Sequence, residues 1–370
     1  MTLSIPTALM FEGWHLQLAD LRGLEKLSQL EELHIKRSTN FPTGLHCLSS
    51  LSNLRSITLE EIDYPGTIPQ EFVGLSRLTK LEVVRFVTVG PLADEIVALA
   101  QLTRLKTLEI SQHYDESLIP ALYALMTSVS SLETLTIPQF ELTDGLVRHL
   151  VLQPKLTTLV VGRWRLTYRA LSGGGDGADA SVPVPLPPPP LPHVRSLSLR
   201  CHDNIVHAAE VPAAVPLIVD VLPGLENLNL CMIFLAAFRP IYTDEALERT
   251  AALLSQACAN MTDGDCGVIA GALPPSVCDV RLDDCPRLGD AGMLALACGL
   301  PGLRSLTLCL ATEVTARGVI RLVYAAPRLT ALTLDMCAPV TAAQCARIMQ
   351  RFIAAGRPEL TIECTHAARE

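Results

Sequence analysis

The most regular feature of the chain is an apolar frame with the spacing L-x-x-L-x-x-L-x-L. The first three copies fall on Leu27, Leu30, Leu33 and Ile35; on Leu51, Leu54, Ile57 and Leu59; and on Leu75, Leu78, Leu81 and Val83. A fourth copy, on Leu102, Leu105, Leu108 and Ile110, gives successive steps of 24, 24 and 27 residues. A frame that recurs at so even a period predicts a stack of equivalent coils, each packed against its neighbours.

The frame continues through the second half of the chain. It falls on Val129, Leu132, Leu135, Ile137; Leu156, Leu159, Val161; Leu191, Val194, Leu197, Leu199; Leu222, Leu225, Leu228, Leu230; Val277, Val280, Leu282; Leu303, Leu306, Leu308; Leu329, Leu332, Leu334; and Leu360, Ile362. The gap from Leu225 to Val277 is 52 residues, or two steps of 26. This gap predicts a degenerate coil near residues 251–256.

The L-x-L pair that ends each frame predicts a short strand whose alternate side chains are buried. No single coil can bury its apolar face without a neighbour on each side. With this pattern the chain resembles leucine-rich repeat proteins over about residues 16–366. The resemblance implies an α/β fold: a horseshoe-shaped solenoid with one parallel strand per coil on the concave face and helices or irregular segments on the convex face.

Two repeat subtypes are visible. Residues 64–83, YPGTIPQEFVGLSRLTKLEV, are similar to plant-type repeats, although Ile62 stands where those have Asn. From residue 261 onward, MTDGDCGVIAGAL, LGDAGMLALACGL, VTARGVIRLVYAA and VTAAQCARIMQRF each predict a turn followed by a helix. These segments resemble the cysteine-containing repeats of F-box proteins and dynein-regulatory-complex subunits. Gly267, Gly292 and Gly318 are expected at matching places in three of them.

The pattern divides the chain into four parts. They are an N-terminal segment (1–15), a first series of coils (16–170), a Gly/Pro-rich disordered insertion (171–192) and a second, cysteine-containing series of coils (193–370). The insertion ends in LPPPPLP, which favours polyproline II and could dock an aromatic-lined groove. A plain spacer is the preferred interpretation, because the segment has no well-placed basic flank to orient it.

The twelve cysteines raise the question of a metal or redox site. No C-x-x-C occurs, and Cys201, His202 and His207 form the only Cys/His cluster, which lacks a fourth ligand. Cys285 and Cys337 each follow the last frame leucine by three residues, where a buried thiol can donate weakly to the backbone of the adjacent coil. Cys298 is expected to pack at a helix end. The sequence therefore predicts neither a metal site nor a cofactor.

Composition and charge limit the classes of partner and the cellular location that the sequence allows. A chain that is 49% hydrophobic but only 4% aromatic must build its core from aliphatic side chains. Its apolar runs are too short to span a membrane, and the N-terminus lacks the features of a secretory signal. A net charge of −9 argues against nucleic acid or an anionic membrane as the main partner. We expect a cytoplasmic protein, compatible with a nuclear or axonemal location, that is not secreted.

No catalytic motif of the type H-E-x-x-H, G-x-S-x-G or G-x-G-x-x-G after a strand occurs, which argues against an enzyme. A general protein-interaction scaffold is the preferred function. The resemblance also implies two alternatives, a substrate-recognition subunit of an SCF-type ubiquitin ligase and a structural subunit of a cytoskeletal or axonemal complex. An F-box needs roughly 40 to 50 residues before the first coil, more than precede the frame here, so this domain is expected to be absent or removed.

The residues that flank each L-x-L pair are expected to project from the concave face and bind a protein partner. The charged members are Glu32, His34, Lys36, Glu60, Glu82, Glu109, Arg200, Asp279, Arg281, Asp283, Asp335 and Glu363. The cluster of Asp279, Arg281, Asp283 and Asp335 is predicted to attract a basic segment of that partner. The C-terminal coil, with no capping helix after Ile362, is expected to self-associate.

We predict that Leu306→Ala and Leu332→Ala each lower the free energy of unfolding by about 2 to 5 kcal/mol, as truncation of a buried leucine does. Cys285→Ser should cost less, about 1 to 3 kcal/mol, because a hydroxyl needs hydrogen bonds that a thiol does not. Chemical denaturation of the three variants measures both. A Cys285→Ser protein of unchanged stability that has lost a bound metal would contradict the packing role.

Overall fold

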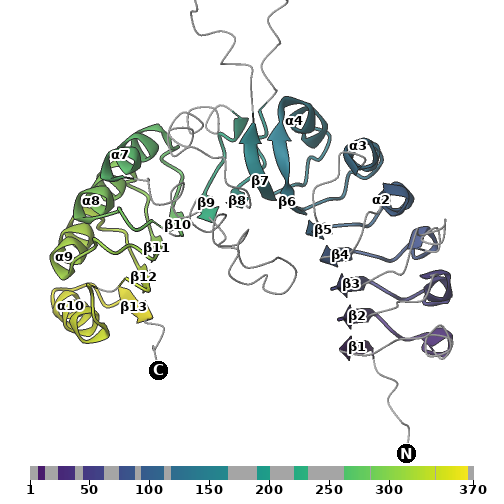
Figure 1. Cartoon of the computed structure of the whole chain (residues 1–370), viewed down its shortest axis with the longest axis horizontal. Helices are drawn as coiled ribbons and strands as arrows, with labels where there is room; N and C mark the ends of the chain where they lie inside the picture. Colours follow the sequence, from purple (N-terminus) through teal and green to yellow (C-terminus); the bar gives the residue numbers. More distant parts are fainter. Residues whose placement is uncertain are drawn as a thin grey trace, which may run out of the picture. The chain divides into compact units, whose positions relative to one another are not determined.

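The computed structural model describes residues 7–12, 24–37, 45–61, 75–87, 93–111, 118–165, 190–200, 221–231, 262–283, 285–337 and 339–365. The chain divides into two compact units, Met1–Val161 (unit 1) and Gly162–Glu370 (unit 2). Each unit repeats one arrangement, in which a short strand is followed by a segment that leads back to the next strand (Figure 1).

Unit 1 is built on strands that pair in parallel and in chain order. They are β1 (Ala8–Glu12), β2 (Glu32–Lys36), β3 (Ser56–Glu60), β4 (Val83–Val87), β5 (Thr107–Ser111) and β6 (Thr134–Thr143), and β7 (Thr158–Arg165) begins at the end of the unit. The connecting segments change along the unit. The 3-10 helices η1 (Leu24–Lys26) and η2 (Leu45–Ser50) come first, and α2 (Ala93–Leu99), α3 (Leu118–Ser128) and α4 (Asp144–Leu150) follow.

Unit 2 repeats the arrangement with longer helices. Its parallel strands are β8 (Ser196–Arg200), β9 (Asn227–Cys231), β10 (Asp279–Leu282), β11 (Ser305–Cys309), β12 (Ala331–Asp335) and β13 (Thr361–Thr365). Its helices are α7 (Asp263–Ala272), α8 (Asp290–Gly299), α9 (Ala316–Ala325) and α10 (Ala342–Ala354). The four turn-and-helix segments expected from the sequence are these four helices.

The frame leucines form the core of both units. In the coil of β3, the side chains of Leu51, Leu54, Ile57 and Leu59 are all fully buried. The last two of these side chains lie in register with Leu33 and Ile35 of β2, so each strand stacks its buried pair on the pair of the preceding coil. A parallel strand in each coil and a continuous stack of buried leucines define a leucine-rich-repeat solenoid, which confirms the predicted fold class.

The chain leaves four strands through the same unusual backbone conformation. Arg37, Glu61, Leu310 and Met336, each the first residue after a strand, have φ angles of 54°, 53°, 57° and 51°. This left-handed turn aims the N–H group at the strand end of the next coil, and Met336 donates to the carbonyl of Thr365 at 2.8 Å. The conformation costs an L-residue roughly 1–2 kcal/mol, and the hydrogen bond between coils offsets that cost.

Helices α7 to α9 are linked by aspartates in their first turns. The Asp263 carboxylate accepts a hydrogen bond at 2.8 Å from the Gly289 N–H, at the start of α8. Asp290 accepts in the same way from the Thr315 N–H at 2.8 Å, at the start of α9. The aspartate therefore occupies the space beside the third residue of the next helix, where a Cβ atom on Gly292 or Gly318 would collide with it.

The matching position in α7 is Asp265, which closes a capping box with Thr262. The expectation that Gly267 matches Gly292 and Gly318 is therefore wrong. A Cβ atom at Gly267 would meet nothing closer than the Ala295 Cβ, at 3.9 Å. Position 267 therefore does not require glycine on steric grounds, whereas positions 292 and 318 do.

Two coils place a polar residue where the frame has its first leucine. Gln153 is fully buried and donates from Nε2 to the carbonyl of Met126 at 2.6 Å, near the end of α3. Arg357 donates to the carbonyl of Val323, in the last turn of α9, and to those of Ala326 and Leu329, which follow the helix. The last carbonyls of a helix have no partner within the helix, so these side chains satisfy groups that a leucine would leave unpaired.

The predicted frame of the third coil is wrong by three positions. Strand β4 begins at Val83, and its buried pair is Val84 and Phe86 rather than Leu81 and Val83. Val84 lies in register with Ile57 of β3 and Leu108 of β5. Leu81 is also buried, because leucines at a spacing of three continue across the start of this strand and make two frames compatible with the sequence.

The predicted degenerate coil between Leu225 and Val277 does not exist as a strand. Asn227 of β9 lies directly in register with Asp279 of β10, so the two strands are neighbours. No further strand therefore lies between β9 and β10 in the sheet, which contradicts a separate coil of 26 residues between them. Residues 251–256 lie outside the described residues.

The boundaries of the predicted parts also shift. Strand β1, at Ala8–Glu12, pairs with β2, so the coils begin within the predicted N-terminal segment 1–15. This strand, ALMFE, was not predicted because no leucine frame precedes it in the sequence. Its Leu9 is only half-buried. Leu191, near the end of the predicted insertion, is fully buried. Residues 166–189, with most of that insertion and the first four residues of its LPPPPLP segment, lie outside the described residues.

The predicted packing role is confirmed for two cysteines and wrong for a third. Cys285 and Cys337 are buried, and the Cys337 thiol lies 3.6 Å from the Leu308 carbonyl of the adjacent coil, as expected. Burial raises the pKa of Cys337 to about 11. Cys298 is exposed on α8, so its predicted packing role is wrong, because that helix turns Met293 and Leu296 inward instead. Cys201, His202 and His207 lie outside the described residues.

We predict that Met336→Gly raises the free energy of unfolding by up to about 1 kcal/mol, because glycine adopts the left-handed turn without strain. The Met336 side chain is 44% exposed, so its loss costs little burial. Thr333→Gly, in the middle of β12, is the control and should destabilise the protein. Urea titrations in which both variants lose stability equally would contradict this view of the turn.

Candidate protein-interaction face

The candidate interaction face is the exposed side of the strands in each unit, which we call the strand face. Along each strand, residues that alternate with the buried pair project from this side, as the pleat requires. In unit 1 the middle row of the face is Met10, His34, Thr58, Arg85, Glu109 and Thr136, which lie in register from β1 to β6. Side chains from separate coils thus come together in one surface, which is polar apart from the exposed Met10.

The strongest cluster on the strand face of unit 1 surrounds Glu60. Lys36 Nζ lies 2.8 Å from one Glu60 carboxylate oxygen, and His34 Nε2 lies 3.3 Å from the other. The hydrogen bond from Lys36 is the main reason that the pKa of Glu60 is lowered, and the same bond raises the pKa of Lys36. The predicted residues His34, Lys36 and Glu60 are therefore brought together, while Glu32 is exposed in the neighbouring row.

A second cluster on this face was missed because the frame of β4 was misplaced. Arg85 projects from the middle of β4, and its Nε lies 3.5 Å from a Glu109 carboxylate oxygen on β5. The Ser111 hydroxyl donates to the other oxygen at 3.1 Å. Phe86 was the available signal: a large apolar residue two positions after Val84 fits the buried pair better than Val83 does.

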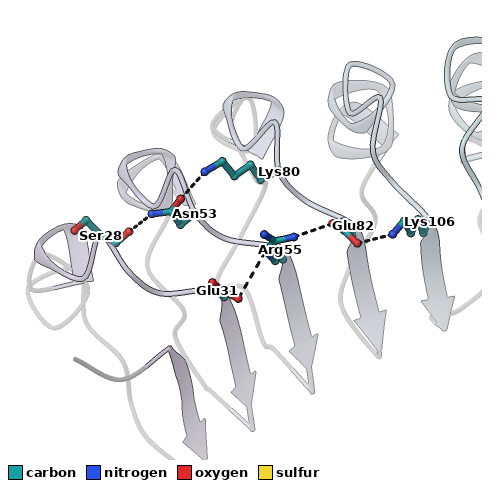
Figure 2. A network of polar contacts seen from close by, with 7 residues as sticks. All are labelled: Ser28, Glu31, Asn53, Arg55, Lys80, Glu82 and Lys106. Carbon is teal, nitrogen blue, oxygen red and sulfur yellow. Dashed lines mark hydrogen bonds and ion pairs between the residues drawn. The ribbon is translucent and has the colours of Figure 1, made fainter. Parts of the chain in front are cut away.

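The prediction that Glu82 projects from the strand face is wrong. It precedes β4 and lies at the N-terminal edge of the strands (Figure 2). One Glu82 oxygen accepts from Arg55 at 3.1 Å, and the other accepts from Lys106 at 2.8 Å. Arg55 also lies 3.6 Å from Glu31, so acidic and basic residues alternate over four consecutive coils.

The alternating charges at this edge hold neighbouring coils together. The Lys106 hydrogen bond lowers the pKa of Glu82, and Glu82 raises the pKa of Lys106. A parallel row lies farther from the strands, where Asn53 donates to the Ser28 carbonyl at 2.6 Å and accepts from Lys80 (Figure 2). Because these groups pair with one another, this edge is structural rather than a free binding surface.

The strand face of unit 2 carries the predicted cluster of Asp279, Arg281, Asp283 and Asp335. Asp279 is exposed, as expected. Asp283 is only 8% exposed, and both of its carboxylate oxygens lie 3.0 Å from Arg281 Nε. The prediction that Asp283 is a freely exposed binding residue is therefore wrong, because Asp283 is paired with Arg281. The neighbouring Cys309 is also buried, and burial raises its pKa to about 12.

The last two strands add further carboxylates to this face. Asp335 is half-buried on β12 and accepts from the Thr365 hydroxyl of β13 at 2.7 Å. Glu363 is exposed in the middle of β13. Arg200 ends β8, but its side chain lies outside what the structure describes. Self-association through the coil of β13 stays a prediction.

The strand faces present charged and hydrogen-bonding side chains. Within the described ranges, His, Cys, Asp and Glu side chains do not gather into any group of three or more that could hold a metal ion. No helix among the described residues is long and apolar enough to cross a membrane.

Similarity to known proteins lies in the fold. No protein-family model and no curated protein matches the chain. An internalin from Listeria monocytogenes is 17% identical over 88% of this chain and 86% of its own, with a TM-score of 0.38. The complex of Rad7 and Elc1 from yeast gives 15% identity, coverages of 94% and 83%, and a TM-score of 0.48. The leucine-rich repeat-containing protein LegL7 from Legionella pneumophila is 13% identical over 89% of this chain and 98% of its own, with a TM-score of 0.47.

We predict that the stability difference between wild type and Glu60→Gln depends on pH. The folded pKa of Glu60 lies below its ordinary value of 4.5, so its contribution is present above that value and is lost as pH falls through the folded pKa. The contribution should stay below about 1 kcal/mol, because the pair is partly exposed. Urea unfolding at neutral and acidic pH measures it.

Glu32→Gln is the matched control, because no ion pair joins Glu32 to another side chain in the described part of the chain. Its stability difference from wild type should change little with pH. The same pH profile for both variants would show that the Lys36 pair does not set the pKa of Glu60.

Proposed function

We propose that this leucine-rich-repeat protein is a non-enzymatic scaffold that binds a protein partner on its strand faces. The observation that supports the proposal most directly is the charge of the strand face of unit 2. Asp279 and Glu363 are exposed there, and Asp335 lies between them along the row of strands. Arg281 is neutralised by Asp283, so the face presents an excess of carboxylates.

The spacing of these carboxylates fits an extended basic segment. Neighbouring strands lie about 4.8 Å apart, so the distance from β10 to β13 is about 14 Å. An extended chain covers that distance in about four residues, which lets lysine or arginine side chains reach carboxylates on separate strands. Asp279 lies in the first row of the face, Glu363 in the middle row and Asp335 in the last, so a partner segment would meet them with long basic side chains that also reach along the strands.

The strand face of unit 1 contributes differently to such binding. Its charges are nearly balanced, since Lys36 pairs with Glu60 and Arg85 pairs with Glu109. Groups that are already paired and held in place favour one arrangement of partner charges over others, which gives specificity more than affinity. A role in a ubiquitin ligase or an axonemal complex would use the same faces.

The test is a quantitative pull-down from cell extract with the full chain as bait. Asp279→Lys combined with Glu363→Lys should reduce capture of the partner at least about tenfold at low salt, and the reduction should shrink at high salt. Both residues are exposed, so the fold should persist, which circular dichroism checks. Glu313→Lys with Glu359→Lys makes the same charge change at two exposed positions outside the strand face and is the matched control.

The proposal requires a set of proteins that the strand-face variant loses and the control variant retains. Loss of the same proteins from both variants would mean that net charge alone governs binding. Loss from neither would remove the strand face of unit 2 as the binding site.

A further inference from the structure

The outer helices at the end of unit 2 carry charges of one sign. The charged residues of α9 are Arg317 and Arg321, and those of α10 are Arg347 and Arg351. Neither helix contains Asp, Glu or Lys. In a chain with a net charge of −9, two adjacent helices with only arginine are a local reversal of the overall charge.

On α9 the arginines form a stripe with one aromatic residue. Helix α9 buries Val319 and Leu322, and it exposes Arg317, Arg321 and Tyr324 on the opposite side. These three residues follow the spacing i, i+4, i+7 that places side chains on one helical face. The Tyr324 side chain is 63% exposed, which is unusual for a large aromatic ring on a convex helix.

Helix α10 continues this surface and is fixed against α9. Its inner side buries Cys345, Ile348 and Phe352, while Arg347 and Arg351 are exposed. The Phe352 ring lies beneath Tyr324 in an edge-to-face contact with the ring centres 4.9 Å apart. The arginines and Tyr324 thus belong to one surface, which we call the outer arginine surface.

Several arginines elsewhere in the described chain are already engaged in ion pairs. Arg55 and Arg281 pair with carboxylates of neighbouring coils or of their own strand. By contrast, no ion pair joins Arg317, Arg321 or Arg351 to any carboxylate among the residues that the structure describes, and Arg347 contacts only the Ala343 carbonyl of its own helix. Their guanidinium groups keep their donors available for another molecule.

The outer arginine surface is bounded along the unit by acidic helices. Helix α7 carries Asp263 and Asp265, and α8 carries Asp290, without a basic residue on either helix. A long polyanion lying along the helices would meet these carboxylates and be repelled. Only a short stretch of negative charge is complementary to the surface.

We propose that the outer arginine surface docks a short acidic segment of another protein. Carboxylates of that segment would pair with guanidinium groups of both helices, and an aliphatic side chain between them would cover the exposed ring of Tyr324. Arginine and tyrosine are the residues that most often dominate the energy of protein interfaces, which agrees with this composition. The surface is separate from the strand face, so this docking does not depend on the proposed function.

The test is a fluorescence anisotropy titration of the full chain with a labelled peptide of about 12 residues in which Glu alternates with Ala around one central Leu. A neutral twin of the peptide has Gln at each Glu position. The acidic peptide should bind at least about tenfold more tightly than its twin at low salt, and the difference should fall as salt rises.

The decisive variant is Arg321→Glu combined with Arg347→Glu, which reverses one exposed charge on each helix. It should weaken binding of the acidic peptide by at least about tenfold. Arg77→Glu with Arg104→Glu, two exposed arginines of unit 1, makes the same charge change and should alter binding less than about twofold. Tyr324→Ala, which keeps every charge, should weaken binding severalfold if the ring is part of the surface.

Three results would overturn the proposal. They are equal binding of the acidic and neutral peptides, equal weakening by the two double variants, and tighter binding of a single-stranded oligothymidylate of the same charge than of the peptide. The third result would assign the surface to nucleic acid. Circular dichroism of each variant confirms that the helices are intact.

Discussion

Every feature of the two units follows from the fact that one coil cannot bury its own leucines. The side chains of Leu54, Ile57 and Leu59 are fully buried only because the next coil stacks on them. Stacking at the spacing of paired strands brings the backbones together, so each coil also satisfies backbone groups of its neighbour, as the Met336 N–H does for Thr365. The left-handed turn at Met336 is unfavourable in itself, and the hydrogen bond that it makes to the next coil stabilises it.

The same constraint sorts the charged residues by role. Charges at the N-terminal edge of the strands, such as Arg55 between Glu31 and Glu82, face the neighbouring coils and pair with them. Charges on the strand faces and the outer helices point away from the stack. Those that have no ion pair with another described residue, such as Asp279 and Arg321, are the ones available to other molecules. Stacking therefore determines which surfaces can bind.

The sequence predicts the stack of coils correctly, but it does not predict where the frame shifts or which charged side chains are paired. Frames such as Leu51 to Leu59 predict their strand correctly because period and burial agree. The frame of β4 is wrong because Leu75, Leu78 and Leu81 continue the spacing of three, and only the packing against Ile57 selects Val84 and Phe86. The burial of Asp283 could not be predicted, since it depends on where the Arg281 side chain lies. The arginines of α9 and α10 are plain in the sequence, but only the fold shows that no ion pair joins them to a carboxylate among the described residues.

Backbone hydrogen exchange, measured residue by residue, tests the stack most directly. Strand β11 lies between β10 and β12, so its amides should be hydrogen-bonded to one neighbour or the other. The amide of Thr307, whose side chain faces solvent, should then exchange as slowly as that of the fully buried Leu306. Fast exchange at Thr307 and slow exchange only at Leu306 would mean that side-chain burial alone protects the strand, and that the coils are not joined through their backbones.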